Sequence, residues 1–318
     1  MEKIYSANAT ILMRVGTLGE IKDCYEKGKI SFGCPLNWLN YALMKNNFTV
    51  GDIHECVFAH LKQNDPLIEQ ASALRGEKLL KLESADGTCY LSLIPTLLAP
   101  ALCFWAIDMQ KKCTETNRTK HLFDLEKFSR ELSQKEDCGY LIIIQPQLFF
   151  DDLCKQIPRA IQENLQILTC NDYDLPFNPK QPIKQGYVDY DRHRNNELFF
   201  DPQDYGDEIF WKMPEYREQS ELRFVIPNIS FDPNCEIARA KKFKIKDVQA
   251  ERYDQNMFRL EVKLQNIKKY AYCFSYHQAK SLLFEGVFDE DTYGFLKVYR
   301  ESAEQLSRRM LDEASRIN

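Results

Sequence analysis

Short apolar runs of strand-like composition alternate irregularly with short helical segments along this chain of 318 residues. A doubly wound sheet would need a regular alternation of strands and helices, because every parallel strand pair requires a long crossover. The irregular order therefore predicts an α+β fold with mixed, mainly antiparallel sheets, flanking short helices and a long C-terminal helix over 290–317. We expect a single domain, 1–318, with one internal loop or linker at 171–184, which is rich in Pro, Asn and Asp.

Local residue chemistry marks several element boundaries. Thr17 followed by Glu20 predicts a capping box that opens a helix, and Gly28 is placed to end it. Asp86-Gly87 is typical of a hairpin turn. Helices are predicted at 18–27, 65–74, 122–132 and 147–162, with a break or restart of the last at Pro158. Strands are predicted at 10–16, 29–33, 78–82, 88–93, 100–107, 138–144, 165–169, 186–190, 235–237, 243–245, 258–264 and 271–274.

Composition narrows the class of protein. A net charge of −5 and a pI near 5.7 do not favour a whole molecule that attracts nucleic acid or anionic lipid. The eleven cysteines include no Cys-x-x-Cys pair, and several lie in apolar runs, so buried reduced thiols are expected. With no apolar signal segment at the N-terminus, the expected location is the cytoplasm, without a membrane partner.

Several familiar catalytic motifs are missing from the sequence. The five histidines show no metal-ligand spacing, so no metal site is predicted. No glycine-rich dinucleotide fingerprint, P-loop or Gly-x-Ser-x-Gly motif is present, which argues against a Rossmann dehydrogenase, a P-loop NTPase and an α/β-hydrolase.

The stretch 215–227 combines dense charge with the start of an apolar strand. Alternate residues of a strand point the same way, so Gln219 and Glu221 are expected to share one face. One interpretation is a charged loop entering an edge strand, with Arg217 and Arg223 pairing the acids. The other is a catalytic carboxylate held by a rigid strand.

Two further features are open to a structural or a functional interpretation. Arg14 lies inside an apolar strand, where its charge needs a partner. That partner is either a neighbouring carboxylate or the phosphate or carboxylate of a ligand. The segment after the second strand carries aromatic side chains that are either core residues or a ligand platform, followed by Asp52 and Glu55. The aromatic candidates are Phe32, Trp38 and Tyr41.

Three matched segments carry a family resemblance: Met13-Arg14, Gly28 to Phe32, and Tyr216 to Phe224. Their layout resembles a broad group of uncharacterised bacterial proteins with an early arginine, a Gly-x-Ile-x-Phe segment and a late Tyr-x-x-Gln-x-Glu-x-Arg. That layout is in turn similar to the arginine–serine–glutamate type of mono-ADP-ribosyltransferase. The matched residues are few, but they span about two thirds of the chain.

The resemblance implies an ADP-ribosyltransferase-like core that uses NAD⁺ as a substrate. Glu221 would stabilise the ribosyl cation, Gln219 would orient the acceptor, and Arg14 would contact NAD⁺. A ring of Phe32, Trp38 or Tyr41 would stack on nicotinamide. The implied acceptor is an intracellular protein or nucleic acid, and the implied role is a bacterial toxin or anti-phage effector, with an antitoxin or phage protein as a further partner.

Two observations keep alternatives open. The family's Ser-Thr-Ser strand has no counterpart here, since Cys103-Phe104-Trp105 stands in the corresponding region, and this favours a non-enzymatic interaction or sensor module. Lys242, Lys244 and Lys246 share one side of a predicted strand. They either block edge pairing or track the phosphates of RNA or DNA, the second of which suits a metal-independent RNase toxin.

Overall fold

The protein is a mixed α+β structure with mainly antiparallel sheets and short helices. The computed structural model describes residues 10–45, 55–108, 137–170, 177–190, 207–212, 221–242 and 257–280. The helices predicted at 122–132 and 290–317 and the strand predicted at 243–245 lie outside these ranges.

The chain divides into two compact units, each built from segments that are distant in sequence. Unit 1 contains Met1–Ile30, Phe104–Lys155 and Lys263–Asn318, and unit 2 contains Ser31–Cys103 and Gln156–Val262. The single domain expected from the sequence stays a prediction. Each unit is described separately below.

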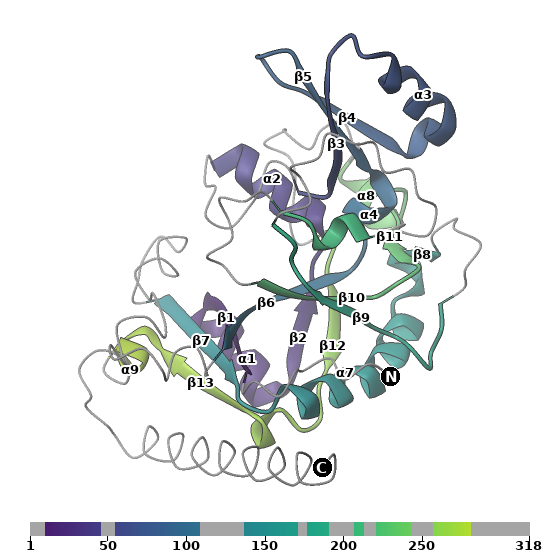
Figure 1. Cartoon of the computed structure of the whole chain (residues 1–318). Coiled ribbons are helices and arrows are strands. Elements are labelled where there is room, and N and C mark those ends of the chain that lie inside the picture. The colour runs from purple at the N-terminus through teal and green to yellow at the C-terminus, as the bar shows by residue number, and fades with distance from the viewer. Residues whose placement is uncertain are drawn as a thin grey trace, which may run out of the picture. The chain divides into compact units, whose positions relative to one another are not determined.

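Unit 1 is built on an antiparallel sheet with the strand order β13-β7-β1-β6 (Figure 1). Arg14 of β1 stands opposite Leu141 of β7, which stands opposite Cys273 of β13. All six residues of β7 are buried, which explains why its sequence is a continuous apolar run. The strands are β1 (Thr10–Thr17), β6 (Ala101–Asp108, of which 104–108 belong to this unit), β7 (Cys138–Ile143) and β13 (Ala271–Ser275).

Helix α1 (Leu18–Lys27) begins and ends where the sequence predicted. The Thr17 side chain accepts from Glu20 N, and the Glu20 carboxylate accepts from Thr17 N, which completes the capping box. The helix ends at Gly28, whose φ of 72° is in the left-handed region. A Cβ at this position would lie 2.1 Å from the carbonyl oxygen of Leu264, so only glycine fits.

Helix α7 (Pro146–Glu163) continues through Pro158, so the predicted break or restart at this proline is wrong. Its buried face is regular, with side chains at helical spacing, and packing of that face offsets a proline penalty of roughly 3 kcal/mol. The buried apolar residues are Phe149, Leu153, Ile157, Ala160 and Ile161.

Asp152 ties the first half of α7 to the connection between β12 (Leu260–Lys263) and β13 within unit 1. Its carboxylate accepts from Gln265 N at 3.1 Å, from Asn266 N at 2.8 Å and from Tyr270 Oη at 2.8 Å. Asp152 is 4% exposed, so these donors replace the water that its carboxylate loses on folding. They hold the short 3₁₀ helix η9 (Ile267–Lys269) against α7.

Unit 2 contains the strand order β6-β10-β9, with the first three residues of β6 in this unit. β10 and β9 pair antiparallel, with Leu222 opposite Tyr187. Two smaller sheets pair β11 with β8 and β2 with β12. The strands are β2 (Lys29–Phe32), β8 (Leu168–Cys170), β9 (Lys184–Tyr187), β10 (Glu221–Val225), β11 (Ile229–Phe231) and β12 (Leu260–Lys263), where β2 and β12 cross the unit boundary.

The helices outside this sheet framework are short. They are α2 (Pro35–Lys45), α4 (Ile94–Leu97), α8 (Glu236–Ala240), α9 (Tyr276–Lys280), and the 3₁₀ helices η1 (Gly76–Lys78), η3 (Leu165–Ile167) and η6 (Asp207–Phe210). The strand predicted at 235–237 is wrong, because these residues cap and begin α8. The run of Glu, Ala and Arg through this segment favours helix, and Ala238 is buried.

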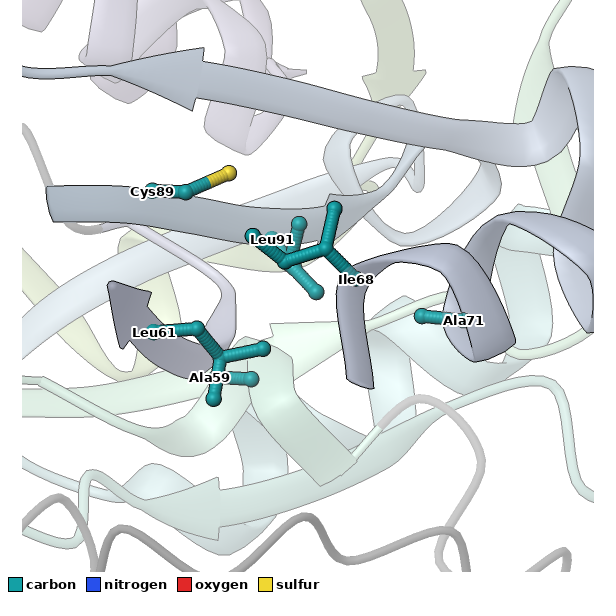
Figure 2. Packing of buried hydrophobic residues seen from close by; sticks show 6 residues of the cluster. All are labelled: Ala59, Leu61, Ile68, Ala71, Cys89 and Leu91. Carbon is teal, nitrogen blue, oxygen red and sulfur yellow. The ribbon is translucent and has the colours of Figure 1, made fainter. Parts of the chain in front are cut away.

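A three-stranded sheet with the order β3-β5-β4 and one helix form a distinct part of unit 2 (Figure 1). The predicted Asp86-Gly87 hairpin joins β4 (Leu79–Glu83) to β5 (Thr88–Leu93), and Asp65 caps α3 (Pro66–Arg75). β3 (Val57–Lys62) was not predicted. Figure 2 shows Ile68 and Ala71 of α3 in one buried cluster with Leu91, Cys89, Leu61 and Ala59 of the strands.

Ten cysteines lie among the described residues, and all ten are free thiols, six of them buried. Burial raises the pKa of Cys34 to about 12 and that of Cys24 to about 11. None of the helices that the structure describes has the length and apolar character needed to cross a bilayer.

Candidate active site

The start of β10 carries two oppositely charged side chains on the same face. Glu221 and Arg223 are two residues apart in the strand, so they point the same way. Glu221 is 4% exposed and Arg223 is 0% exposed. Two charges removed from water in this way must find compensation inside the protein.

Arg223 lies between two carboxylates. Its Nε donates to Glu221 Oε1 at 2.7 Å, and its Nη2 donates to Glu221 Oε2 at 3.3 Å. On its other side, Nη1 pairs with the Glu55 carboxylate and donates to the carbonyl oxygen of Ile209. The planar guanidinium therefore holds Glu221 through two parallel hydrogen bonds and is itself fixed from the opposite side.

Lys212 brings a second cation to the same carboxylate. Its Nζ lies 3.0 Å from Glu221 Oε2, and its side chain is 3% exposed. The backbone at this point is anchored, because Lys212 N donates to Asp189 O at 3.1 Å. Tyr190 Oη accepts from Glu221 N at 3.2 Å, which fixes the strand backbone beneath the carboxylate.

The charges of the four buried ionised side chains sum to zero. Glu55 and Glu221 contribute two negative charges, and Lys212 and Arg223 contribute two positive charges. A buried group of ions requires such balance, because a single uncompensated buried charge costs about 3–5 kcal/mol. We call these four side chains the buried charge cluster.

The cluster perturbs the acid–base behaviour of its members and neighbours. Burial by itself would raise the pKa of Glu221, but the charges of Arg223 and Lys212 outweigh it and hold that pKa below its usual value. Burial, reinforced by the Glu221 charge, raises the pKa of Tyr190 to about 12. Burial also raises the pKa of Cys103, whose thiol hydrogen-bonds to Glu221. Glu221 is thus an ionised carboxylate at any physiological pH.

An aromatic ring borders the cluster. The guanidinium carbon of Arg223 lies 5.0 Å from the ring centroid of Trp38, within the range of a cation–π contact. Trp38 lies in α2 and is half-buried. Its neighbour Asn37 donates to the carbonyl oxygen of Phe258 at 3.2 Å, which fixes this part of α2.

The structure brings only some of the predicted site residues together. Glu221 and Trp38 both contact Arg223 in unit 2. Phe32 is in the same unit, but its ring is fully buried and therefore packs as a core residue in this conformation. Tyr41 lies in α2, and Lys242 is exposed just after α8. Gln219, Lys244 and Lys246 lie outside the described residues.

Arg14 belongs to unit 1, so its convergence with Glu221 stays a prediction. Its side chain is half-buried on the side of β1 that α1 covers. Gly16, two residues further along the strand, faces Ile21 of α1, and the Arg14 charge opposes the effect of burial on the pKa of Cys24.

Sequence reasoning missed Lys212 and Tyr190. No local signal indicated the burial of Lys212, since lysine is almost never fully buried unless it is paired, and its partner Glu221 lies nine residues further along the chain. Glu55 was noted only as an acidic residue near the aromatic segment, because nothing local indicates its pairing with a residue at position 223.

No group of His, Cys, Asp and Glu among the described residues is arranged to hold a metal ion. Comparison of the chain with protein-family models, with curated proteins and with solved structures gave no match.

Proposed function

We propose that the protein is an NAD⁺-dependent ADP-ribosyltransferase with Glu221 as its catalytic carboxylate. The observation that carries this proposal is the ionised, almost fully buried carboxylate of Glu221, held by Arg223 at the strand position that the Gln-x-Glu motif assigns to catalysis. Buried charge stabilises a developing opposite charge much more strongly than a solvated one does. Strongly perturbed ionisable groups gathered at one place also favour a functional site.

The proposed reaction breaks the glycosidic bond between the ribose C1′ and the nicotinamide nitrogen. Nicotinamide leaves with the bonding electron pair, and an oxocarbenium-like ribosyl cation develops. Glu221 accepts a hydrogen bond from the ribose 2′-hydroxyl and stabilises that positive charge. An acceptor nucleophile then bonds to C1′ and loses its proton, giving an ADP-ribosylated acceptor, nicotinamide and H⁺.

Other residues have assigned roles in the same proposal. Arg14 anchors the phosphates of NAD⁺ through its guanidinium fork, and Gln219 orients the acceptor. Trp38 is the aromatic residue favoured to contact nicotinamide, because it is half-buried beside Arg223 whereas Phe32 is fully buried. The acceptor is a cytoplasmic protein or nucleic acid, as expected for a bacterial toxin or anti-phage effector.

Nicotinamide release from NAD⁺ in the presence of cell extract tests the proposal. Glu221→Gln should lower the rate by ~10²–10³, as removal of an electrostatic stabiliser does. Because that change leaves the cluster with excess positive charge, the double variant Glu221→Gln/Lys212→Met is the essential comparison. It restores neutrality, so it should be folded like the wild type and still be as inactive as the single variant.

A non-enzymatic interaction module is the second candidate, and one observation favours it. Both oxygens of Glu221 already accept hydrogen bonds from cations of the protein itself. If their role is only structural, wild-type protein and both variants will release no nicotinamide with any extract. Release by the wild type, lost in the balanced double variant, excludes this candidate.

A further inference from the structure

The two cations of the buried charge cluster hold Glu221 in different ways. Arg223 contacts both carboxylate oxygens through Nε and Nη2 and is fixed behind by Glu55 and by the carbonyl of Ile209. Lys212 approaches Glu221 with its ammonium group at one oxygen, Oε2. Arg223 thus holds Glu221 through two hydrogen bonds, whereas the Lys212 ammonium contacts Glu221 as a point charge at one oxygen.

The positive charge of Lys212 balances the remaining charge of the cluster. Arg223 with its two carboxylates, Glu55 and Glu221, carries a net charge of minus one. Without Lys212, this buried group would attract a cation to Glu221 Oε2. An ammonium group from the protein fills that position in this structure.

The backbone at Lys212 is held by hydrogen bonds that do not involve its side chain. Lys212 N donates to Asp189 O, and Asp189 N donates to Phe210 O at 2.7 Å, so the main chain is held on both sides of Trp211. The ammonium is attached through a flexible four-carbon stem, which can rotate while these backbone hydrogen bonds remain.

We infer that the Lys212 ammonium occupies the position of a cationic ligand group at Glu221 Oε2, and that an organic cation displaces it on binding. The inference rests on the proposed function, which supplies the cation as the pyridinium–ribose end of NAD⁺. Glu221 becomes available to the ribose 2′-hydroxyl only when Lys212 has moved. Lys212 therefore acts as a specificity residue. A ligand that displaces the Lys212 ammonium restores the charge balance at Glu221 only if it carries a positive charge of its own.

Binding of two dinucleotides that differ in ring charge tests this inference. Carba-NAD⁺ retains the pyridinium charge but cannot release nicotinamide, and NADH has an uncharged dihydropyridine ring. Calorimetric titration should show that Lys212→Met binds carba-NAD⁺ on the order of tenfold more tightly than the wild type, because the closed ion pair no longer reduces the competent fraction. Affinity for NADH should change much less.

Two further variants keep the test interpretable. Lys212→Gln removes the charge but retains a hydrogen-bond donor for Glu221, so it serves if the methionine variant does not fold. Lys81→Met removes an exposed lysine from β4 of the same unit and should bind both dinucleotides like the wild type.

The outcomes separate the inference from the proposed function. If wild-type protein releases nicotinamide but neither Lys212 variant gains affinity for carba-NAD⁺, the inference is wrong and the proposed function stands. An equal gain for carba-NAD⁺ and NADH also overturns it, because steric unblocking then explains the result. If no folded variant binds carba-NAD⁺ and none releases nicotinamide, the proposed function is overturned and the inference with it.

Discussion

Arg223 and Glu221 form an ion pair within a single strand, with Nε of the arginine 2.7 Å from Oε1 of the glutamate and neither residue more than 4% exposed. Two residues of spacing in β10 place both on one face, so the pairing follows from local geometry. The remaining partners lie outside β10: Lys212 is in the segment after η6, and Glu55 is far away in the sequence, just before β3. The Glu221–Arg223 pair is therefore encoded within β10, whereas the neutral cluster of four charges forms only in the folded protein.

Removal of the Glu221 charge should destabilise the protein strongly. Glu221→Gln leaves Lys212 and Arg223 with only Glu55 as an anionic partner, and breaking a buried pair typically costs about 3–5 kcal/mol. The free energy of unfolding from urea denaturation measures this loss. Glu221→Gln/Lys212→Met restores a neutral cluster and should recover most of it.

The control for this prediction is an exposed glutamate. Glu83 of β4 is exposed and accepts a hydrogen bond from Gln63, so Glu83→Gln should change the free energy of unfolding by no more than about 0.5 kcal/mol. Equal effects of the two single substitutions would show that the Glu221 charge contributes nothing special to stability.

The same cluster predicts a loss of stability in acid. The charges of Arg223 and Lys212 lower the pKa of Glu221 in the folded protein, whereas an unfolded glutamate titrates near a pKa of about 4.3. The unfolded state therefore binds a proton more readily. The contribution of Glu221 is complete above the unfolded pKa and is lost as the pH falls below it toward the folded pKa.

Denaturation curves between about pH 6 and pH 3 measure this contribution. In the part of that range below about pH 4.3, the wild type should lose up to roughly 1.4 kcal/mol per pH unit more than Glu221→Gln/Lys212→Met, because one proton is linked to unfolding. Parallel curves for the two proteins would contradict the lowered pKa of Glu221.

Features encoded within a few residues were the ones that the sequence predicted well. The capping box of α1, the Gly28 end and the Asp86-Gly87 hairpin each depend on contacts over at most a few positions. β3 also had a local signal, since Val57, Ala59 and Leu61 alternate with Phe58, His60 and Lys62, but its polar flanks obscured it.

Long-range packing decided the features that sequence reasoning did not predict. α7 continues through Pro158 because its buried face is stabilised by the core, which no local propensity reveals. The partnership of Glu55 with Arg223 joins positions far apart in the chain. The charge balance that defines the candidate site is therefore a property of the fold, while the Glu221–Arg223 pair was visible as a motif.

Gly28 should tolerate no side chain. Gly28→Ala places a Cβ on a residue with φ of 72° and 2.1 Å from Leu264 O, so either the end of α1 or the chain at Leu264 must move. The backbone conformation alone costs about 1–2 kcal/mol, and the collision adds to it. Thermal unfolding monitored by circular dichroism measures the sum.

Gly87→Ala is the matched control for that collision. Gly87 has φ of 81°, but nothing lies within 4 Å of the position of its added Cβ. This variant should therefore show only the conformational cost, and its melting temperature should fall less than that of Gly28→Ala. If the two variants melt together, the close approach of Leu264 to Gly28 has no energetic consequence.

The small cluster between α3 and the β3-β5-β4 sheet offers a test on a single helix. Ile68 is 8% exposed and packs in the cluster with Leu91 (Figure 2). Leu74 of the same helix is 68% exposed. Ile68→Ala should destabilise the protein by about 2–5 kcal/mol, because it removes buried methyl groups and leaves a cavity, while Leu74→Ala should be within about 0.5 kcal/mol of the wild type.

Hydrogen exchange of the β3 and β5 amides shows which part of the protein loses stability in Ile68→Ala. Faster exchange there in Ile68→Ala, with little change elsewhere, means that this sheet and helix open as a local unit; equal acceleration throughout unit 2 means that they unfold with the rest of it.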